Sequence, residues 1–375
     1  MGSKTQSTMI INDIKVTALE VPLNKTYKGS YYSMTKRATL ITEISTDDGI
    51  NGIIYNGDEP EEQLEIRNII LNEISPIIKG LNPLNVEMIW EKCFYLTKNI
   101  LRNRSTVIKA ISCVDSALWD IVGKKANMPL RQLWGSYHDE LPIIAIGGYY
   151  SKNLNDLNSE IEDYQKLGIS GCKMKIGSAS PEEDAKRFIQ MRKFAGEKFI
   201  LIADANQGYG EQEAIEFCNL VRDYQIDWIE EPIEWIIDRQ SLKSIRYKTG
   251  IAVAAGQSEI SRQGILDLIN NESIDICNFD ASWGGGPTEW LKVAGLCESN
   301  SIHMAHHEEP QISAQLLGSV NKAKYIECFH PDRDPIFWNL LENKKIANGK
   351  YKIPNLPGWG ITLNNDFINK YKVTV

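Results

Sequence analysis

Residues 171–206 read GCKMKIGSASPEEDAKRFIQMRKFAGEKFILIADAN. Two short apolar runs, Gly171–Ile176 and Phe199–Ala203, flank a segment whose apolar residues have helical spacing. Ser180 is the expected N-cap of this helix, and Glu183, three residues later, completes a capping box. A proline in the first turn and a glycine after the last one support the same boundaries. The stretch therefore predicts a strand–helix–strand unit.

The same alternation of a short apolar run and a helix recurs from residue 141 onward. Most runs return after roughly 20 to 30 residues, the period of a βα unit. They are Leu141–Ile146, Gly171–Ile176, Phe199–Ala203, Asp227–Ile229, Ile251–Ala255, Asp275–Phe279, Ser301–Ala305 and Lys324–Cys328. This series favours a (β/α) barrel, with a doubly wound open sheet as the alternative. No G-x-G-x-x-G motif follows the first run, which counts against a dinucleotide-binding fold.

The N-terminal part of the chain has a different pattern. Strands are expected at Ile14–Val21, Arg37–Ile44 and Ile50–Tyr55, and helices at Glu62–Ile78 and Ser105–Lys125. Between the first two strands, Pro22–Thr35 is polar with small and aromatic residues, which suits either a mobile lid or an ordinary hairpin loop.

Composition is that of a soluble globular protein. The 375 residues contain 42% apolar and 24% charged residues, enough for one large barrel with a smaller companion or for two mid-sized domains. Apolar runs fall short of the 18 or so residues that cross a bilayer, and no signal peptide is recognised, so no membrane association is expected. Residues 1–8 (MGSKTQST) are interpreted as a disordered leader or a cloning remnant.

The cysteines and the net charge exclude several further classes of protein. The seven cysteines are scattered without a C-x-x-C pair, which argues against a disulfide framework or a zinc site and favours the cytoplasm. The net charge is −8 and no basic block is present, so no nucleic-acid partner is expected. An acidic protein that binds an anion must reverse the field locally with lysines or a metal.

Polar residues follow the predicted strands one after another. Catalytic groups of a barrel lie at the C-terminal ends of its strands. The residues found there are Lys173, Lys175, Asp204, Asn206, Glu230, Glu231, Gln257, Glu259, Asp280, His306, His307 and Glu327. Any one of them could be a helix cap, a core residue or a solvated strand face. The complete series, in register with the strand ends, indicates a catalytic site.

Lys173 and Lys175 are two residues apart on a strand, so their side chains point to the same face. Two neighbouring ammonium groups repel each other, and we expect the pKa of at least one to fall. Such a lysine can act as a general base near neutral pH.

Asp204 and Glu230 offer hard oxygen ligands on neighbouring strands, which suit Mg²⁺ rather than zinc. A hard cation that binds a substrate carboxylate stabilises the enediolate formed when the α-proton leaves. Asp280 can orient a histidine on the next strand and so form an acid–base dyad across the barrel. The residues therefore predict abstraction of a proton beside a carboxylate.

From about residue 10 to its C-terminus, the chain resembles the mandelate racemase subgroup of the enolase superfamily. The motifs that carry the resemblance are Lys173-Met174-Lys175, DANQGY from Asp204, WIEEP from Trp228, DASWGGGPTEW from Asp280 and HHEEPQISAQLL from His306. The resemblance implies a (β/α)7β barrel over residues 140–329. It also implies an α+β capping domain over residues 9–135, completed by the C-terminal tail, 330–375.

The resemblance also implies roles for individual residues. Lys175 matches the base on the second strand, and Lys173 tunes it. Asp204 and Glu230 match the first two metal ligands. The third is normally a glutamate and here is Gln257; its amide oxygen can still coordinate Mg²⁺, or a local shift brings in Glu259 instead.

On the opposite side, His307 matches the histidine of the seventh strand better than His306 does, judged by its distance from the following ISA motif. Asp280 matches its partner, and Glu327 matches the acid that hydrogen-bonds the substrate carboxylate. No lysine follows Asp280, which disfavours the muconate-lactonizing and enolase subgroups.

A base on each side of the substrate leaves two reactions open. In relatives of this kind dehydration of a sugar acid is the commonest outcome, and racemisation or epimerisation by 1,1-proton transfer is the alternative. A non-catalytic relative that binds a carboxylate is the alternative from another class. Relatives are often homo-oligomers. Expected substrate contacts are Asn206, Tyr149, Tyr31 and Lys28, although Asn206 could be a turn residue and Tyr149 could simply pack.

Overall fold

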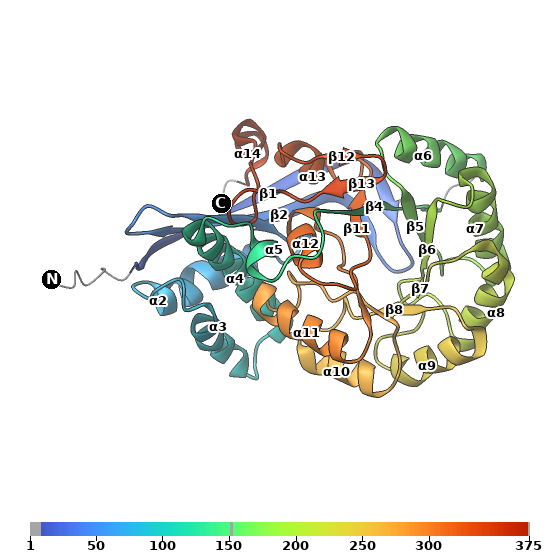
Figure 1. The fold of residues 1–375 in the computed structure, drawn as a ribbon, viewed down its shortest axis with the longest axis horizontal. Coiled ribbons are helices and arrows are strands. Elements are labelled where there is room, and N and C mark those ends of the chain that lie inside the picture. Colours follow the sequence, from blue (N-terminus) through green and yellow to red (C-terminus); the bar gives the residue numbers. More distant parts are fainter. Residues whose placement is uncertain (1–8, 151–152, 374–375) are drawn as a thin grey trace.

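The computed structural model describes residues 9–150 and 153–373; the predicted leader, residues 1–8, lies outside this part. Its centre is a ring of parallel strands in chain order, surrounded by helices (Figure 1). The strands of the ring are β4 (Glu140–Gly147), β5 (Gly171–Lys175), β6 (Ile200–Asp204), β7 (Ile229–Glu230), β8 (Val253–Ala255), β9 (Ile276–Cys277), β10 (His303–Met304) and β11 (Ile326–Phe329).

The ring closes on itself. β11 pairs in parallel with β4, and a parallel bridge between Met304 and Ala323 joins β10 to the segment before β11. A doubly wound sheet would have two open edges, so the alternative architecture is wrong and the (β/α)7β barrel is confirmed. The short runs at β7, β9 and β10 suffice because each strand lies buried between two neighbours.

Helices connect successive strands and cover the outside of the barrel (Figure 1). They are α6 (Asn155–Lys166), α7 (Pro181–Ala195), α8 (Glu211–Val221) with the 3₁₀ turn η3 (Arg222–Tyr224), α9 (Asp238–Thr249), α10 (Arg262–Asn270), α11 (Pro287–Ser299) and α12 (Pro310–Gly318). In α7 the Ser180 hydroxyl accepts the backbone N–H of Glu183 at 3.4 Å, and Gly196 follows with φ 82°. The predicted N-cap at Ser180 and the predicted glycine stop thus mark the two ends of α7, between β5 and β6.

The N-terminal part forms a cap beside the barrel. Its antiparallel sheet contains β1 (Ile11–Lys28), β2 (Ser33–Thr46) and β3 (Gly52–Asn56), and the long helix α4 (Arg104–Ala126) packs on β2 and β3. The helices are α1 (Gln63–Ile69), the π-helical η1 (Ile70–Ile74), α2 (Ser75–Ile78), α3 (Val86–Phe94), the 3₁₀ turn η2 (Tyr95–Lys98), α4 (Arg104–Ala126) and α5 (Leu130–Leu133). The helix predicted over 62–78 is thus present with a π-helical turn in its middle.

The C-terminal tail returns to the cap. It contains α13 (Pro335–Leu340), β12 (Ile346–Ala347), β13 (Lys350–Lys352) and α14 (Asn365–Tyr371). β13 pairs with β4 of the barrel, and α13 and α14 pack on the cap sheet, where Ile336 and Leu340 join Leu19 and Ile41 in one apolar cluster. The fold is therefore a barrel with an α+β cap, and the exact limits of the two parts stay a prediction.

The segment predicted as a loop, Pro22–Thr35, is mostly strand. β1 runs to Lys28 and β2 begins at Ser33, so a long hairpin with an irregular register extends from the cap to the barrel (Figure 1). The loop prediction is wrong over most of its length because paired backbone continues on both sides of a tight turn. At its tip, the Ser30 hydroxyl contacts the carbonyl oxygens of Ile176 and Ala205, at 3.2 and 3.0 Å.

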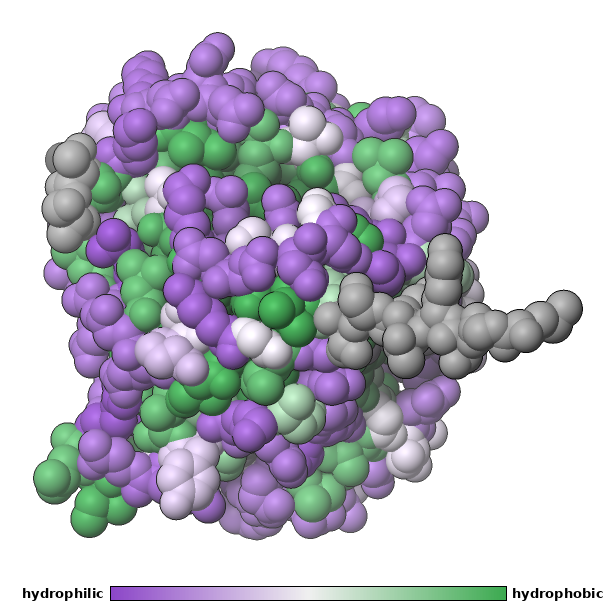
Figure 2. Space-filling view, turned by 90° about the vertical axis from the view of Figure 1, so that its left-hand side faces the viewer, coloured by the Kyte–Doolittle hydropathy of each residue, from purple (hydrophilic) through white to green (hydrophobic). Residues whose placement is uncertain are grey.

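The outer face of the cap is mainly hydrophilic, with hydrophobic side chains in separate small groups (Figure 2). Across the described residues, no helix has the length and apolar character needed to span a membrane. All seven cysteines are buried and free.

Candidate active site

Lys173 and Lys175 lie on β5, every residue of which is buried. The Lys173 ammonium lies 2.7 Å from Glu230 Oε1 and 2.7 Å from Glu327 Oε1, so it joins the end of β7 to β11 across the barrel. Lys175, one step closer to the mouth, donates to Asp204 Oδ2 at 2.6 Å and to Asn206 Oδ1 at 2.8 Å. The two lysines therefore share one face of the strand, as the spacing predicts.

The expectation that one lysine has a lowered pKa is wrong for these contacts. Burial does lower the pKa of each ammonium, but the facing carboxylates outweigh it. Glu230 and Glu327 raise the pKa of Lys173, and Asp204 raises that of Lys175 well above its usual value. Each lysine thus pairs with carboxylates more strongly than it repels the other.

Three oxygen-bearing side chains follow consecutive strands. Asp204 and Glu230 are directly paired positions of β6 and β7, and both side chains are buried. Gln257 follows β8, is buried, and accepts a hydrogen bond from the Asn278 amide at 3.1 Å. Two carboxylates and one amide are oxygen donors of the type that Mg²⁺ prefers, so this set fits a hard divalent cation.

Glu259 is directed elsewhere. Its carboxylate lies 2.6 Å from the guanidinium of Arg239, a residue of α9. Over the part of the chain that the structure describes, no three His, Cys, Asp or Glu side chains converge on a common metal position. Of the two alternatives for a third ligand, the geometry therefore favours the Gln257 amide.

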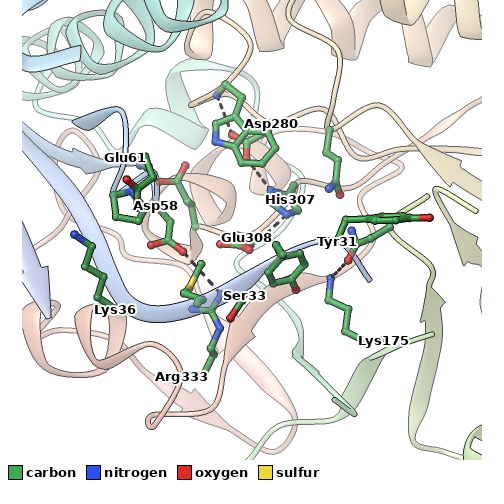
Figure 3. A pocket seen from close by; sticks show the side chains of 18 of the residues that line it. Tyr31, Ser33, Lys36, Asp58, Glu61, Lys175, Asp280, His307, Glu308 and Arg333 are labelled. Atoms are coloured by element: carbon green, nitrogen blue, oxygen red, sulfur yellow. Dashed lines mark hydrogen bonds and ion pairs between the residues drawn. The ribbon is translucent and has the colours of Figure 1, made fainter. Parts of the chain in front are cut away.

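His307 follows β10 and enters the pocket from another direction than Lys175 (Figure 3). Its Nδ1 donates to Asp280 Oδ2 at 3.0 Å, and its Nε2 lies 3.5 Å from Glu308 Oε1. Burial disfavours the charged imidazole, but Glu308 and Asp280 outweigh it and raise the pKa of His307 to about 9. His307 is therefore protonated at neutral pH.

Glu327 lies on β11, next to β4, and is buried. Its Oε1 pairs with Lys173, and its Oε2 accepts the backbone N–H of Glu308 at 3.0 Å. It thus connects the Lys173 side of the site with the His307 side.

These residues surround a pocket of about 470 Å³ between the barrel mouth and the cap. Lys175, Asn206, Gln257, Asp280, His307 and Tyr31 line it, together with Trp283, whose ring centre lies 5.0 Å from that of His307. The side chains of Lys173, Asp204, Glu230 and Glu327 lie outside this lining and contact the lining residues or one another.

Two of the predicted substrate contacts lie apart from this pocket. Lys28 and Tyr149 line a neighbouring cavity of about 490 Å³ under the β1–β2 hairpin. Tyr149 is half-buried there, and burial raises the pKa of its hydroxyl. Tyr31, at the hairpin tip, is 75% exposed at the rim of the main pocket.

Several lining residues were not predicted. Asp58 follows β3, Glu308 follows His307, and Arg333 follows β11 (Figure 3). Arg333 Nε and Nη1 are buried and make no hydrogen bond within the described residues. The position of Glu308 directly after the histidine pair was a usable signal, whereas nothing in the sequence connects Asp58 or Arg333 with the barrel.

Comparisons with known proteins agree with this fold. Residues 156–367 match the enolase C-terminal domain-like family, and residues 11–135 match the N-terminal domain of mandelate racemase/muconate lactonizing enzyme. An enolase-type barrel with its cap is thereby defined over most of the chain. The chain belongs to the mandelate racemase subgroup of the enolase superfamily of enzymes.

Individual relatives carry out different reactions. Arabinonate dehydratase of Saccharolobus solfataricus is 31% identical, over 89% of this chain and 90% of its own length. Hydrophobic dipeptide epimerase of Enterococcus faecalis is 27% identical, over 78% and 81%. A mandelate racemase/muconate lactonizing enzyme from a marine actinobacterium, solved in complex with magnesium, is 42% identical with a TM-score of 0.93 over 98% of this chain and 100% of that one.

Proposed function

We propose that this enzyme removes the α-proton of a sugar acid and then eliminates water from it, with Mg²⁺ as cofactor. The observation that carries the proposal is the placement of Lys175 and His307, which face the same pocket from β5 and from the end of β10 (Figure 3). A substrate between them has one group beside its α-hydrogen and another beside its β-hydroxyl.

The metal ligands in this proposal are Asp204, Glu230 and Gln257. Their oxygen chemistry suits Mg²⁺, and the solved relative from a marine actinobacterium binds this ion. When bound, Mg²⁺ stabilises the negative charge that develops on the substrate carboxylate. Replacement of the usual glutamate by Gln257 leaves one negative charge fewer around the ion.

Lys175 is the base of the proposed reaction. A base must be uncharged, and the ion pair with Asp204 at 2.6 Å opposes this. Lys175 therefore accepts a proton only when the charge of Asp204 is taken up elsewhere in the site. Asn206, at 2.8 Å, holds its nitrogen at the pocket.

His307 is the acid. The C–H bond breaks as Lys175 takes the proton, and the electron pair enters the carboxylate to give an enediolate. The C–O bond at the β-carbon then breaks as His307 protonates the leaving hydroxyl. Water departs, His307 is left neutral, and the enol rearranges to a 2-keto-3-deoxy acid. The protonated state of His307 and the relation to arabinonate dehydratase support this assignment.

Racemisation or epimerisation is the second candidate. Lys175 and His307 could exchange protons on opposite faces of one α-carbon, and the relation to hydrophobic dipeptide epimerase supports this reading. It would require His307 to act as a base in one direction, which its two neighbouring carboxylates oppose.

The test is incubation of the purified enzyme with a panel of sugar acids and Mg²⁺ in D₂O, followed by NMR. A 2-keto-3-deoxy product is expected. Deuterium at the α-carbon without elimination would instead establish the epimerase reading. If the enzyme is folded and binds Mg²⁺ but gives neither signal with any acid of the panel, both reactions are refuted.

A further inference from the structure

The His307 imidazole lies between two carboxylates. Asp280 accepts from Nδ1 at 3.0 Å, and Glu308 Oε1 lies 3.5 Å from Nε2. Nε2 is the ring nitrogen left to face a substrate, and both His307 and Glu308 line the pocket. Glu308 is thus placed at the reacting nitrogen.

Two contacts hold Glu308 in this position. Its Oε2 lies 3.0 Å from Nη2 of Arg37, which comes from β2 of the cap. Its backbone N–H donates to Glu327 at 3.0 Å. Its φ is 54°, and that of Glu309 is 52°, so two consecutive non-glycine residues adopt the left-handed conformation. This conformation is unfavourable for residues other than glycine, so the surrounding contacts must stabilise it.

The charge of Glu308 is fixed as well. Burial opposes ionisation, but Arg37, His307 and Arg333 lower its pKa to about 2. It is therefore a carboxylate at every pH at which the fold is expected to work.

We propose that Glu308 is a positioning residue that keeps both nitrogens of His307 protonated, so that His307 meets the substrate as an acid. This inference rests on the proposed function, because it explains why the site favours elimination over proton return. With Asp280 alone, Nδ1–H would be fixed and Nε2 would be free to act as a base. A carboxylate beside Nε2 stabilises the second N–H.

The other groups around His307 either disfavour its doubly protonated form or leave it unaffected. Lys173 lowers the pKa of His307 through its charge. His306 is buried, and burial lowers its own pKa, so it adds no charge. Trp283 packs its ring against the imidazole. Asp280 and Glu308 are therefore the groups that hold the proton.

An alternative role for Glu308 is structural, as one of three carboxylates around Arg37. The other two are Asp58, in direct contact with the guanidinium, and Asp334, at 3.4 Å. Asp58 thus offers a matched control. Asp58→Asn removes a carboxylate from the same arginine, and among the residues described Asp58 forms no hydrogen bond or ion pair with His307.

The experiment is an NMR titration of the histidine ring protons in the full-length protein, which needs no substrate. The chain has five histidines, so His307 can be assigned with His307→Asn. In Glu308→Gln, which keeps size and hydrogen bonding, the pKa of His307 should fall from about 9 toward the usual value of roughly 6.5. The alkaline limb of elimination should move down with it. In Asp58→Asn the pKa of His307 should stay near that of the unmodified protein.

An unchanged pKa of His307 in folded Glu308→Gln would overturn the inference, as would an equal fall in Asp58→Asn. Should Glu308→Gln fail to fold, Glu308→Asp answers the same question, because it keeps the charge but withdraws it from Nε2; it should give a smaller fall in the same direction. Failure of the proposed function is recognised separately. In that case the pKa of His307 would still fall in Glu308→Gln, but no sugar acid would yield a product.

Discussion

His306 and His307 are adjacent in the chain, yet the structure holds them in opposite protonation states. Nε2 of His306 accepts the backbone N–H of Ala281 at 3.1 Å, so its Nδ1 carries the proton and donates to the His307 carbonyl at 2.8 Å. Burial lowers the pKa of this imidazole. His307, between Asp280 and Glu308, has a pKa raised to about 9. One histidine therefore supports the backbone, and the other carries a second ring proton at the pocket.

Stability should depend on this proton. The pKa of His307 is raised on folding, from about 6.5 to about 9, so its contribution is complete below pH 6.5 and is lost as the pH rises through 9. The shift corresponds to something on the order of 3 kcal/mol. Urea unfolding between pH 6 and 10 should show a larger alkaline loss in the unmodified protein than in His307→Asn. Parallel curves would contradict the raised pKa.

Replacing either of the two proposed reacting side chains should lower elimination, but only one replacement should abolish exchange of the α-proton. Lys175→Met should lower turnover by about 10²-fold or more and abolish exchange of the α-proton with solvent deuterium, because the base is gone. His307→Asn should lower elimination by a similar factor but retain the exchange. Both rates are measured by NMR in D₂O. Ser45→Ala, at the far end of β2 and outside the pocket lining, serves as the control. Equal loss of exchange in both variants would contradict the assigned roles.

The polar residues at the strand ends could be predicted from the sequence, but contacts between residues far apart in the sequence could not. The βα period places Lys175 and Asp204 at neighbouring strand ends, and the structure joins them at 2.6 Å. The Arg37–Glu308 pair joins residues 271 positions apart, so no local pattern reveals it. Tyr149 is an expected substrate contact, but it lines the adjacent cavity, a placement that no local pattern reveals.

Lysine pKa values were misjudged for a related reason. Spacing brings Lys173 and Lys175 together and predicts repulsion. The carboxylates that outweigh it come from β6, β7 and β11, and their distances depend on how the barrel closes. Electrostatics in a buried site thus follows from tertiary structure rather than from neighbours in the chain.

Magnesium should stabilise the folded protein. At a concentration 100-fold above the dissociation constant, a ligand of the folded state adds about 2.7 kcal/mol. Thermal melts with and without Mg²⁺ should therefore differ, and Asp204→Asn should remove the difference. Gln257→Glu should increase the shift at low Mg²⁺, because it adds a negative charge to the ligand set. Glu259→Gln is the matched control, since Glu259 pairs with Arg239. Loss of the shift in Glu259→Gln, but not in Gln257→Ala, would reverse the ligand assignment.

The β1–β2 hairpin should affect substrate binding through a single hydroxyl. Ser30 Oγ reaches the carbonyl oxygens of Ile176 and Ala205, directly after β5 and β6, and so fixes the tip of the hairpin beside Lys175 and Asp204. A hydrogen bond of this kind contributes about 1 kcal/mol, which corresponds to roughly a fivefold change in an equilibrium. Ser30→Ala should therefore raise KM about fivefold with little change in kcat, because the tip of the hairpin lines the pocket but carries neither of the two proposed reacting groups. Ser45→Ala, at the far end of β2, where the hydroxyl contacts the Asp13 carbonyl at 3.4 Å, should leave KM unchanged. Steady-state kinetics on the acid identified by NMR measures both, and a fall in kcat with constant KM in Ser30→Ala would show that the hairpin acts on the reacting groups instead.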